Sequence, residues 1–137
     1  MGDGFLATFG LTAVQEEEVC RHALKAAAEL RTEFTRFNQG RQATDKPVMD
    51  FGLSLHLGDV FYGNIGASNR LDFTVVGPAV NEASRIQDLC RPLGCNILIS
   101  SAFHEMASTS QGELVSLGAH RLRGVRAPQE LFTLAID

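Results

Sequence analysis

Asn81 and Arg85 are the two residues whose types and spacing most directly suggest chemistry. They lie four residues apart in "GPAVNEASRIQDLC", where Pro78 is favourable at the first position of a helix, so we expect both side chains on one helical face. Neither belongs to the apolar stripe of that helix, which includes Ile86. An amide beside a guanidinium suits a phosphate group, because Arg offers several fixed donors and stays charged. A solvated helix face is the alternative.

Asp3 is a candidate metal ligand near the start of the chain. It lies between two glycines in "MGDGFLATFG", and a simple turn residue is one explanation, because Asp and Gly both favour turns. At the tip of a hairpin, however, an exposed carboxylate can bind a divalent cation. Mg²⁺ typically takes one or two carboxylates together with phosphate oxygens. Asp3 is therefore either a turn residue or a cation ligand.

The remaining candidates lie in strand-like segments. Thr74 interrupts the apolar run "FTVVG" and is either a good strand former or a hydroxyl that contacts a base edge. The segment "HRLRGVRAP" gathers one histidine and three arginines in an otherwise acidic protein. On a strand, Arg121 and Arg123 would share a face, either a charged solvent face or a phosphate-binding one. The four histidines lack metal-ligand spacing, so we expect them at surface or half-buried positions.

The elements that must hold these residues follow from hydrophobic periodicity and turn residues. Helices are predicted from a Thr12–Gln15 capping box to about Asn38, from Pro78 to about Cys90, and over "SAFHEMA". Strands are predicted over residues 5–9 and 51–57, in "GDVFYGNIG", "LDFTVVG" and "CNILIS", and in a closing pair, "ELVSLGAHRLRG" with "ELFTLAI". Residues 51–57 alternate apolar and polar, which indicates a half-buried strand. The order favours an α+β fold, with helices packed on a mostly antiparallel sheet.

Length and composition restrict the classes of function. The 137 residues fit one compact domain spanning 1–137, without a repeat or an interdomain linker. A formal charge of −4 argues against a nucleic-acid coat. No apolar run approaches the length of a membrane span, and no basic segment followed by an apolar core indicates secretion. Three cysteines without a CxxC pair suggest a reducing cytosol rather than a disulfide framework.

Four segments, taken in order, resemble one family: "GDGFLATF", "LHLGDVFYGNIG", "RLDFTVVGPAVNEASR" and "HRLRGVRAPQELFTL". They are similar to the catalytic domain of class III adenylate and guanylate cyclases, specifically its bacterial adenylate cyclase branch, over nearly the whole chain. The resemblance implies the ferredoxin-like βαββαβ-type cyclase fold. It also implies conversion of ATP to 3′,5′-cyclic AMP and pyrophosphate in cyclic-nucleotide signalling.

The resemblance gives each candidate residue a role. Asp3 matches one of the family's two metal-binding aspartates, and Thr74 matches the position that contacts the adenine. Asn81 matches the residue that orients the ribose, and Arg85 the one that stabilises the transition state at the phosphate. Arg123 matches a position where related enzymes hold the triphosphate with Lys, and the change to Arg alters reach and geometry.

Further expectations concern cofactors, partners and location. The resemblance implies two Mg²⁺ or Mn²⁺ ions and a head-to-tail homodimer, in which one chain supplies the metal aspartates and the other Thr74, Asn81 and Arg85. No nucleic acid or membrane contact is expected for this domain. It is expected in the cytoplasm, where it is an independent protein or the cytosolic domain of a larger or membrane-anchored one. Pro78 and Glu82 replace residues more usual in the family.

The resemblance also places Gly-Asp-Gly in the middle of a hairpin. The first strand with the other metal aspartate, the first helices, and a second strand with a base-contacting Lys would precede it. We therefore expect an N-terminally incomplete domain that has little cyclase activity alone. The alternative function is a non-catalytic cyclase-like module that binds nucleotide or a partner domain. Other nucleotidyl enzymes that share the fold are disfavoured by the pair of Asn81 and Arg85.

Overall fold

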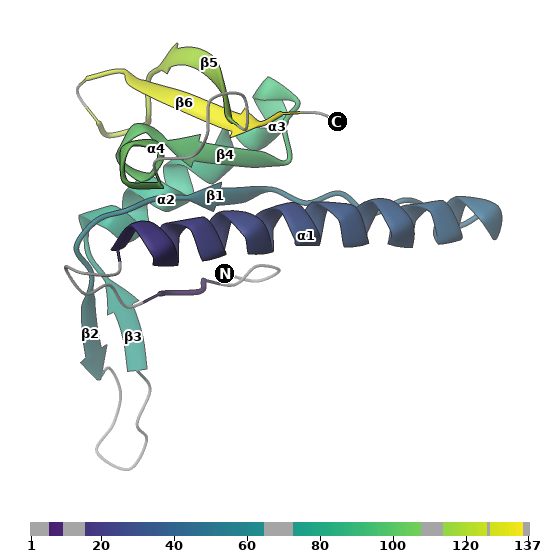
Figure 1. Ribbon diagram of the computed structural model, residues 1–137, viewed down its shortest axis with the longest axis horizontal. Helices are drawn as coiled ribbons and strands as arrows, with labels where there is room; N and C mark the ends of the chain where they lie inside the picture. Colours follow the sequence, from purple (N-terminus) through teal and green to yellow (C-terminus); the bar gives the residue numbers. More distant parts are fainter. Residues whose placement is uncertain (1–5, 10–15, 65–72, 108–113, 126, 136–137) are drawn as a thin grey trace.

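The computed structural model describes residues 6–9, 16–64, 73–107, 114–125 and 127–135, with the backbone alone for residues 62–64 and 73–76. Figure 1 shows its helices and strands. In chain order they are α1 (Glu16–Ala43), β1 (Leu53–Leu55), β2 (Phe61–Asn64), β3 (Phe73–Val76), α2 (Pro78–Asp88), α3 (Cys90–Leu93), β4 (Ile97–Ser100), α4 (Ser101–Ala107), β5 (Leu114–His120) and β6 (Gln129–Leu134).

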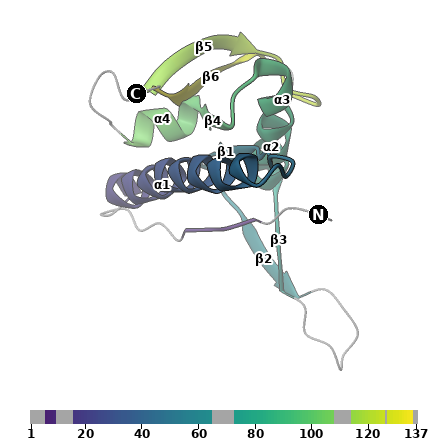
Figure 2. The same ribbon diagram turned by 90° about the vertical axis from the view of Figure 1, so that its right-hand side faces the viewer.

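Four strands form a mixed sheet in the order β1-β4-β6-β5. β1 runs parallel to β4, with Leu53 opposite Ile97, whereas β4 with β6 and β5 with β6 are antiparallel. β2 and β3 form a separate antiparallel hairpin, which extends away from the sheet in both views (Figures 1 and 2). The predicted α+β class and the mostly antiparallel pairing are confirmed.

α1 and α4 cover one face of the sheet. Ile97 and Ile99 of β4 point to this face and meet Phe132 of β6 and Phe103 of α4 in one buried cluster. The cluster also contains a stripe of small residues on α1, which includes Ala23. Small side chains at helical spacing let α1 lie close against the sheet. The apolar residues predicted to share one face of residues 51–57 pack against this same cluster.

α2 and α3 cover the opposite face. Leu98 of β4 and Leu131 of β6 are fully buried here against Ile86 of α2 and Cys90 of α3. Leu122, which follows β5, completes the cluster. Burying each such side chain contributes about 1.5–3 kcal/mol. α2 is therefore fixed to the sheet through Ile86, on the side of the helix away from solvent.

The start of α2 depends on the residue pair Gly77-Pro78. Gly77 has φ 139°, a conformation that favours glycine, and no side chain caps the first turn. Pro78 occupies the first turn, where its missing N–H is not needed. After Leu89, the short helix α3 ends at Gly94 with φ 66°. The helix predicted from Pro78 to about Cys90 is thus confirmed, with its end split into two helices.

Three local predictions were wrong. Leu6–Phe9 is not a strand, because the described residues offer no neighbouring strand to complete its hydrogen bonds. α1 ends at Ala43 rather than near Asn38. The exposed Gly40 costs the helix only about 1 kcal/mol and so does not end it. The Lys46 N–H closes the last turn by donating to the Arg41 carbonyl at 2.8 Å. β5 ends at His120, so the arginine-rich segment after it is a turn. The predicted Thr12–Gln15 capping box lies outside the described residues.

Candidate functional site

The first part of the candidate site is the exposed side of α2. Asn81 is exposed, and the Arg85 side chain is 41% exposed. Arg85 Nη1 lies 3.8 Å from Asp88 Oδ2, an exposed pair of a kind that contributes little to stability. Ile86 anchors the helix on its other side. The prediction that Asn81 and Arg85 lie on one helix, away from its apolar stripe, is confirmed, and both side chains are accessible to a ligand.

Three side-chain contacts join α2 to β1 and its flanking residues. Ser54 Oγ donates to the Ala83 carbonyl at 2.6 Å, and Gln87 Nε2 donates to the Gly52 carbonyl at 2.8 Å. Glu82 Oε2 lies 3.0 Å from His56 Nε2. The polar residues of the β1 segment thus face α2 and not solvent. The predicted half-buried strand is covered on both of its faces.

His56 is the most buried titratable group of this contact region, with a side chain only 8% exposed. Its Nδ1 lies 2.9 Å from Ser100 Oγ, which also accepts the Phe103 N–H at 3.2 Å. Burial lowers the pKa of His56, and the neighbouring Glu82 carboxylate opposes that change. The ring is therefore neutral at neutral pH. Sequence reasoning treated His56 as an ordinary half-buried residue and gave Glu82 no role; a histidine on the polar side of an alternating strand was the available signal.

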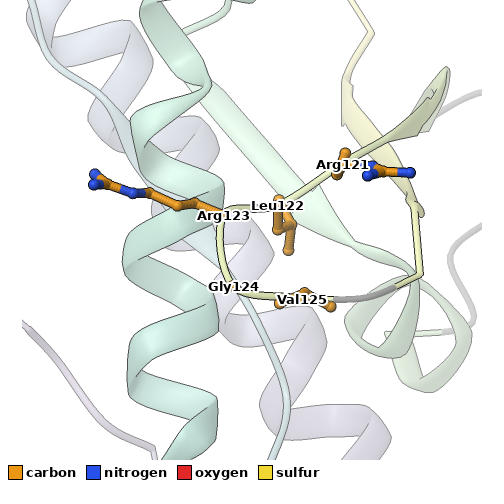
Figure 3. Close-up of a pocket in the computed structure, with 5 residues that line it drawn as sticks. All are labelled: Arg121, Leu122, Arg123, Gly124 and Val125. Atoms are coloured by element: carbon orange, nitrogen blue, oxygen red, sulfur yellow. The ribbon is translucent and has the colours of Figure 1, made fainter.

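Arg123 lies in the turn that connects β5 to β6. The Val125 N–H closes this turn on the Leu122 carbonyl at 3.1 Å, and Leu122 packs with Ile86 of α2. An open hollow of about 590 Å³ is lined by residues 121–125. Figure 3 shows the Arg121 and Arg123 side chains pointing in opposite directions from it. The expectation that the two arginines share a face was wrong, because this segment is a turn and not a strand.

The structure places Asn81 and Arg85 about one turn apart on α2 and leaves the other candidates less defined. Thr74 lies on β3 opposite Gly63, and only its backbone is described. Asp3 lies outside the described residues. Within the described ranges, no group of three or more His, Cys, Asp or Glu residues is arranged to hold a metal ion. The metal-binding role of Asp3 therefore stays a prediction.

A cleft of about 580 Å³ lies behind the first turn of α2. Its walls are Leu6–Phe9, α1, the residues that follow β1, and α2 itself, and it includes His56 but neither Asn81, Arg85 nor Arg123.

Burial raises the pKa of Cys20, which lines the cleft, so this thiol stays protonated and is a poor nucleophile at neutral pH. None of the described helices is long and apolar enough to cross a membrane.

Comparison with known proteins assigns the family. Residues 1–136 match the family model described as the adenylate and guanylate cyclase catalytic domain. An adenylate cyclase of Anabaena cylindrica is 40% identical over 84 residues, which are 58% of this chain and 17% of that protein. An uncharacterised protein of Mycobacterium tuberculosis is 32% identical over 133 residues, or 95% of this chain and 22% of that protein. The chain thus spans about a fifth of the length of these relatives.

Solved structures agree with the family model. A bacterial light-regulated adenylyl cyclase matches with a TM-score of 0.67 at 27% identity, covering 86% of this chain and 33% of that one. The adenylyl cyclase CyaB from P. aeruginosa matches with a TM-score of 0.72 at 20% identity, covering 89% and 61%. The guanylyl cyclase Cya2 matches with a TM-score of 0.68 at 22% identity, covering 88% and 60%. The last two matches bear on the fold alone. With its order of helices and strands and a family match over residues 1–136, the chain belongs to the adenylate and guanylate cyclase catalytic domain family.

Proposed function

We propose that this chain is the catalytic part of an adenylate cyclase that converts ATP to 3′,5′-cyclic AMP and pyrophosphate. The observation that carries the proposal is the pair of an exposed Asn81 and a partly exposed Arg85 on α2, a helix that Ile86 anchors to the sheet on its other side. An amide and a guanidinium four residues apart present several hydrogen-bond donors toward one ligand. The guanidinium stabilises the negative charge that develops as the ribose 3′-hydroxyl attacks the α-phosphorus.

ATP is the proposed nucleotide for two reasons. The Anabaena relative, 40% identical over 84 residues, is an adenylate cyclase. Thr74 lies on β3, the strand that directly precedes α2, and its hydroxyl can both donate and accept, which suits an adenine edge.

Arg123 is proposed to bind the triphosphate, because its turn packs beside α2 through Leu122. Its side chain is exposed and carries a permanent charge.

The proposed enzyme uses Mg²⁺ or Mn²⁺, with Asp3 as one ligand, and works as a head-to-tail homodimer. When bound, two divalent ions activate the attacking hydroxyl and neutralise phosphate charge. The support for a shared site is the exposure of Asn81 and Arg85 on α2, which leaves their side chains accessible to a second copy of the chain. A non-catalytic module that binds nucleotide is the competing function, and only turnover distinguishes the two.

The test compares Arg85→Ala with a matched control in the full-length protein. Arg36→Ala is the control, because Arg36 also pairs with a carboxylate three residues away, Glu33, on an exposed helix face. We expect Arg85→Ala to lower kcat for ATP about 100- to 1000-fold, with a smaller effect on KM, because the charge that it stabilises develops in the transition state. Arg36→Ala should leave both unchanged.

The same assay decides substrate and function. Wild-type protein is supplied with ATP or GTP, with Mg²⁺ or Mn²⁺, and both cyclic products are measured. Cyclic AMP as the main product supports the proposal. A clear preference for GTP refutes the choice of nucleotide, and near-normal turnover by Arg85→Ala refutes the role of Arg85. Nucleotide binding without any cyclic product favours the non-catalytic module.

A further inference from the structure

We propose that His56 and Glu82 are positioning residues: their contact fixes how α2 is rotated on the sheet, and so where Asn81 and Arg85 point. The inference rests on the function proposed above. Glu82 directly follows Asn81 and precedes Arg85 by three residues, so it lies within one helical turn of both. Its carboxylate reaches the His56 ring at 3.0 Å, while Asn81 remains exposed.

A neutral His56 ring satisfies both of its partners in one tautomer, because the Glu82 carboxylate can only accept a hydrogen bond. Ser100 Oγ accepts the Phe103 N–H, so its own hydrogen is free to donate to His56 Nδ1. The ring then keeps its single hydrogen on Nε2, from which it donates to Glu82. In this arrangement both ring nitrogens of His56 and the Ser100 hydroxyl have hydrogen-bond partners. This series of contacts links α4, β4 and the residue after β1 to the first half of α2.

This link adds to the few contacts that hold the first half of α2. Gly77 provides no side-chain cap for the first turn, and the Gln87 contact with Gly52 lies beyond Arg85. Ser54 binds the Ala83 carbonyl, which fixes the height of the helix axis over β1. Glu82 adds a second contact at nearly the same level, which resists rotation about that axis. A misplacement of about 1 Å at a reacting centre can cost about 100-fold in rate, so even a small rotation is detectable.

The environment of His56 also predicts a pH signature. Its titratable neighbours are Glu82 on α2, Asp59 on its own loop, and Glu16 and Cys20 of α1 across the cleft. When acid protonates Nδ1 of His56, that atom can no longer accept the hydrogen bond from the Ser100 hydroxyl. Low pH therefore weakens the contact between His56 and Ser100. Glu82 raises the pKa of His56, against the larger effect of burial. Removing the charge at residue 82 should therefore move the acid limb of activity to lower pH.

Two substitutions at residue 82 separate charge from geometry in the full-length protein. Glu82→Gln keeps an oxygen that accepts from Nε2, so we expect kcat near the wild-type value at pH 8 and an acid limb moved to lower pH. Glu82→Leu removes the acceptor, so we expect kcat to fall about 10- to 100-fold at every pH, with KM changed much less. Glu18→Gln is the matched control, because Glu18 pairs with His22 at 3.9 Å on an exposed face of α1, and it should change nothing.

A second measurement does not depend on cyclase activity. The NMR signals of the Asn81 amide and the Arg85 guanidinium should shift clearly more in Glu82→Leu than in Glu82→Gln, and not at all in Glu18→Gln. If the wild type makes no cyclic nucleotide, the proposed function fails, and these signals still decide the positioning role. Glu82→Ala replaces Glu82→Leu if the latter does not fold. Equal kcat values for Glu82→Leu and wild type, or unchanged NMR signals in the folded variant, overturn the inference.

Discussion

Gly58 is where a single methyl group should disturb the seating of α2. A Cβ built at Gly58 would lie 2.6 Å from the Ala79 Cβ, and no other atom beyond its chain neighbours is as close. Carbon atoms pack best at about 3.5–4.0 Å, so Gly58→Ala requires the loop and the first turn of α2 to separate by about 1 Å. A Cβ cannot rotate away on either side, because each is attached directly to the backbone.

The expected cost follows from this geometry. Overpacking of this size typically destabilises a protein by about 1–3 kcal/mol. Gly58 is not among the glycines with positive φ, so its cost is steric and not conformational. Removing the opposing methyl should relieve it: Ala79→Gly alone costs about 0.5–1 kcal/mol as a glycine in a helix, and the double variant should cost little more than that. The two substitutions are therefore coupled favourably by about 1–3 kcal/mol, the steric cost that is relieved.

Urea unfolding followed by circular dichroism measures all three variants. Gly40→Ala is the control, because Gly40 lies within α1 and a Cβ there meets nothing within 4 Å. It should stabilise the protein by about 0.5–1 kcal/mol through helix propensity alone. A Gly58→Ala protein as stable as wild type, or a double variant that is merely additive, would refute the steric reasoning and with it the close seating of α2 against the loop.

Two further predictions concern the two sides of α2. The free energy of unfolding should fall as pH drops below about 6.5, because burial lowers the pKa of His56 and the unfolded chain then takes up the proton first. Denaturation midpoints measured between pH 8 and 5 give the dependence of stability on pH, which should be weaker in His56→Gln than in the wild type. An unchanged dependence would contradict the burial of the ring. Ile86→Ala should cost about 2–5 kcal/mol in urea unfolding, since Ile86 is 0% exposed, whereas Val115→Ala, at a site 46% exposed, should cost far less. Similar costs for the two would show that Ile86 is not a core residue.

Local patterns in the sequence determined most of the elements that hold the site. The Gly77-Pro78 pair and the spacing of apolar residues placed the helix of Asn81 and Arg85 correctly, because a helix start and one buried stripe are properties of a short segment. The alternation of residues 51–57 likewise separated the apolar side from the side of Ser54 and His56. The predicted closing pair of strands, β5 with β6, was also found.

Tertiary structure decided which neighbours each predicted segment packs against. Leu6–Phe9 has the composition of a strand, yet a strand exists only beside a neighbour, and no local pattern supplies one. The arginines after β5 were predicted on one face, and a turn packed through Leu122 sends Arg121 and Arg123 apart (Figure 3). From the sequence alone, the polar side of β1 would be assigned to solvent. Only the packing of α2 across it buries His56 and brings Glu82, 26 residues further along the chain, to 3.0 Å from its ring.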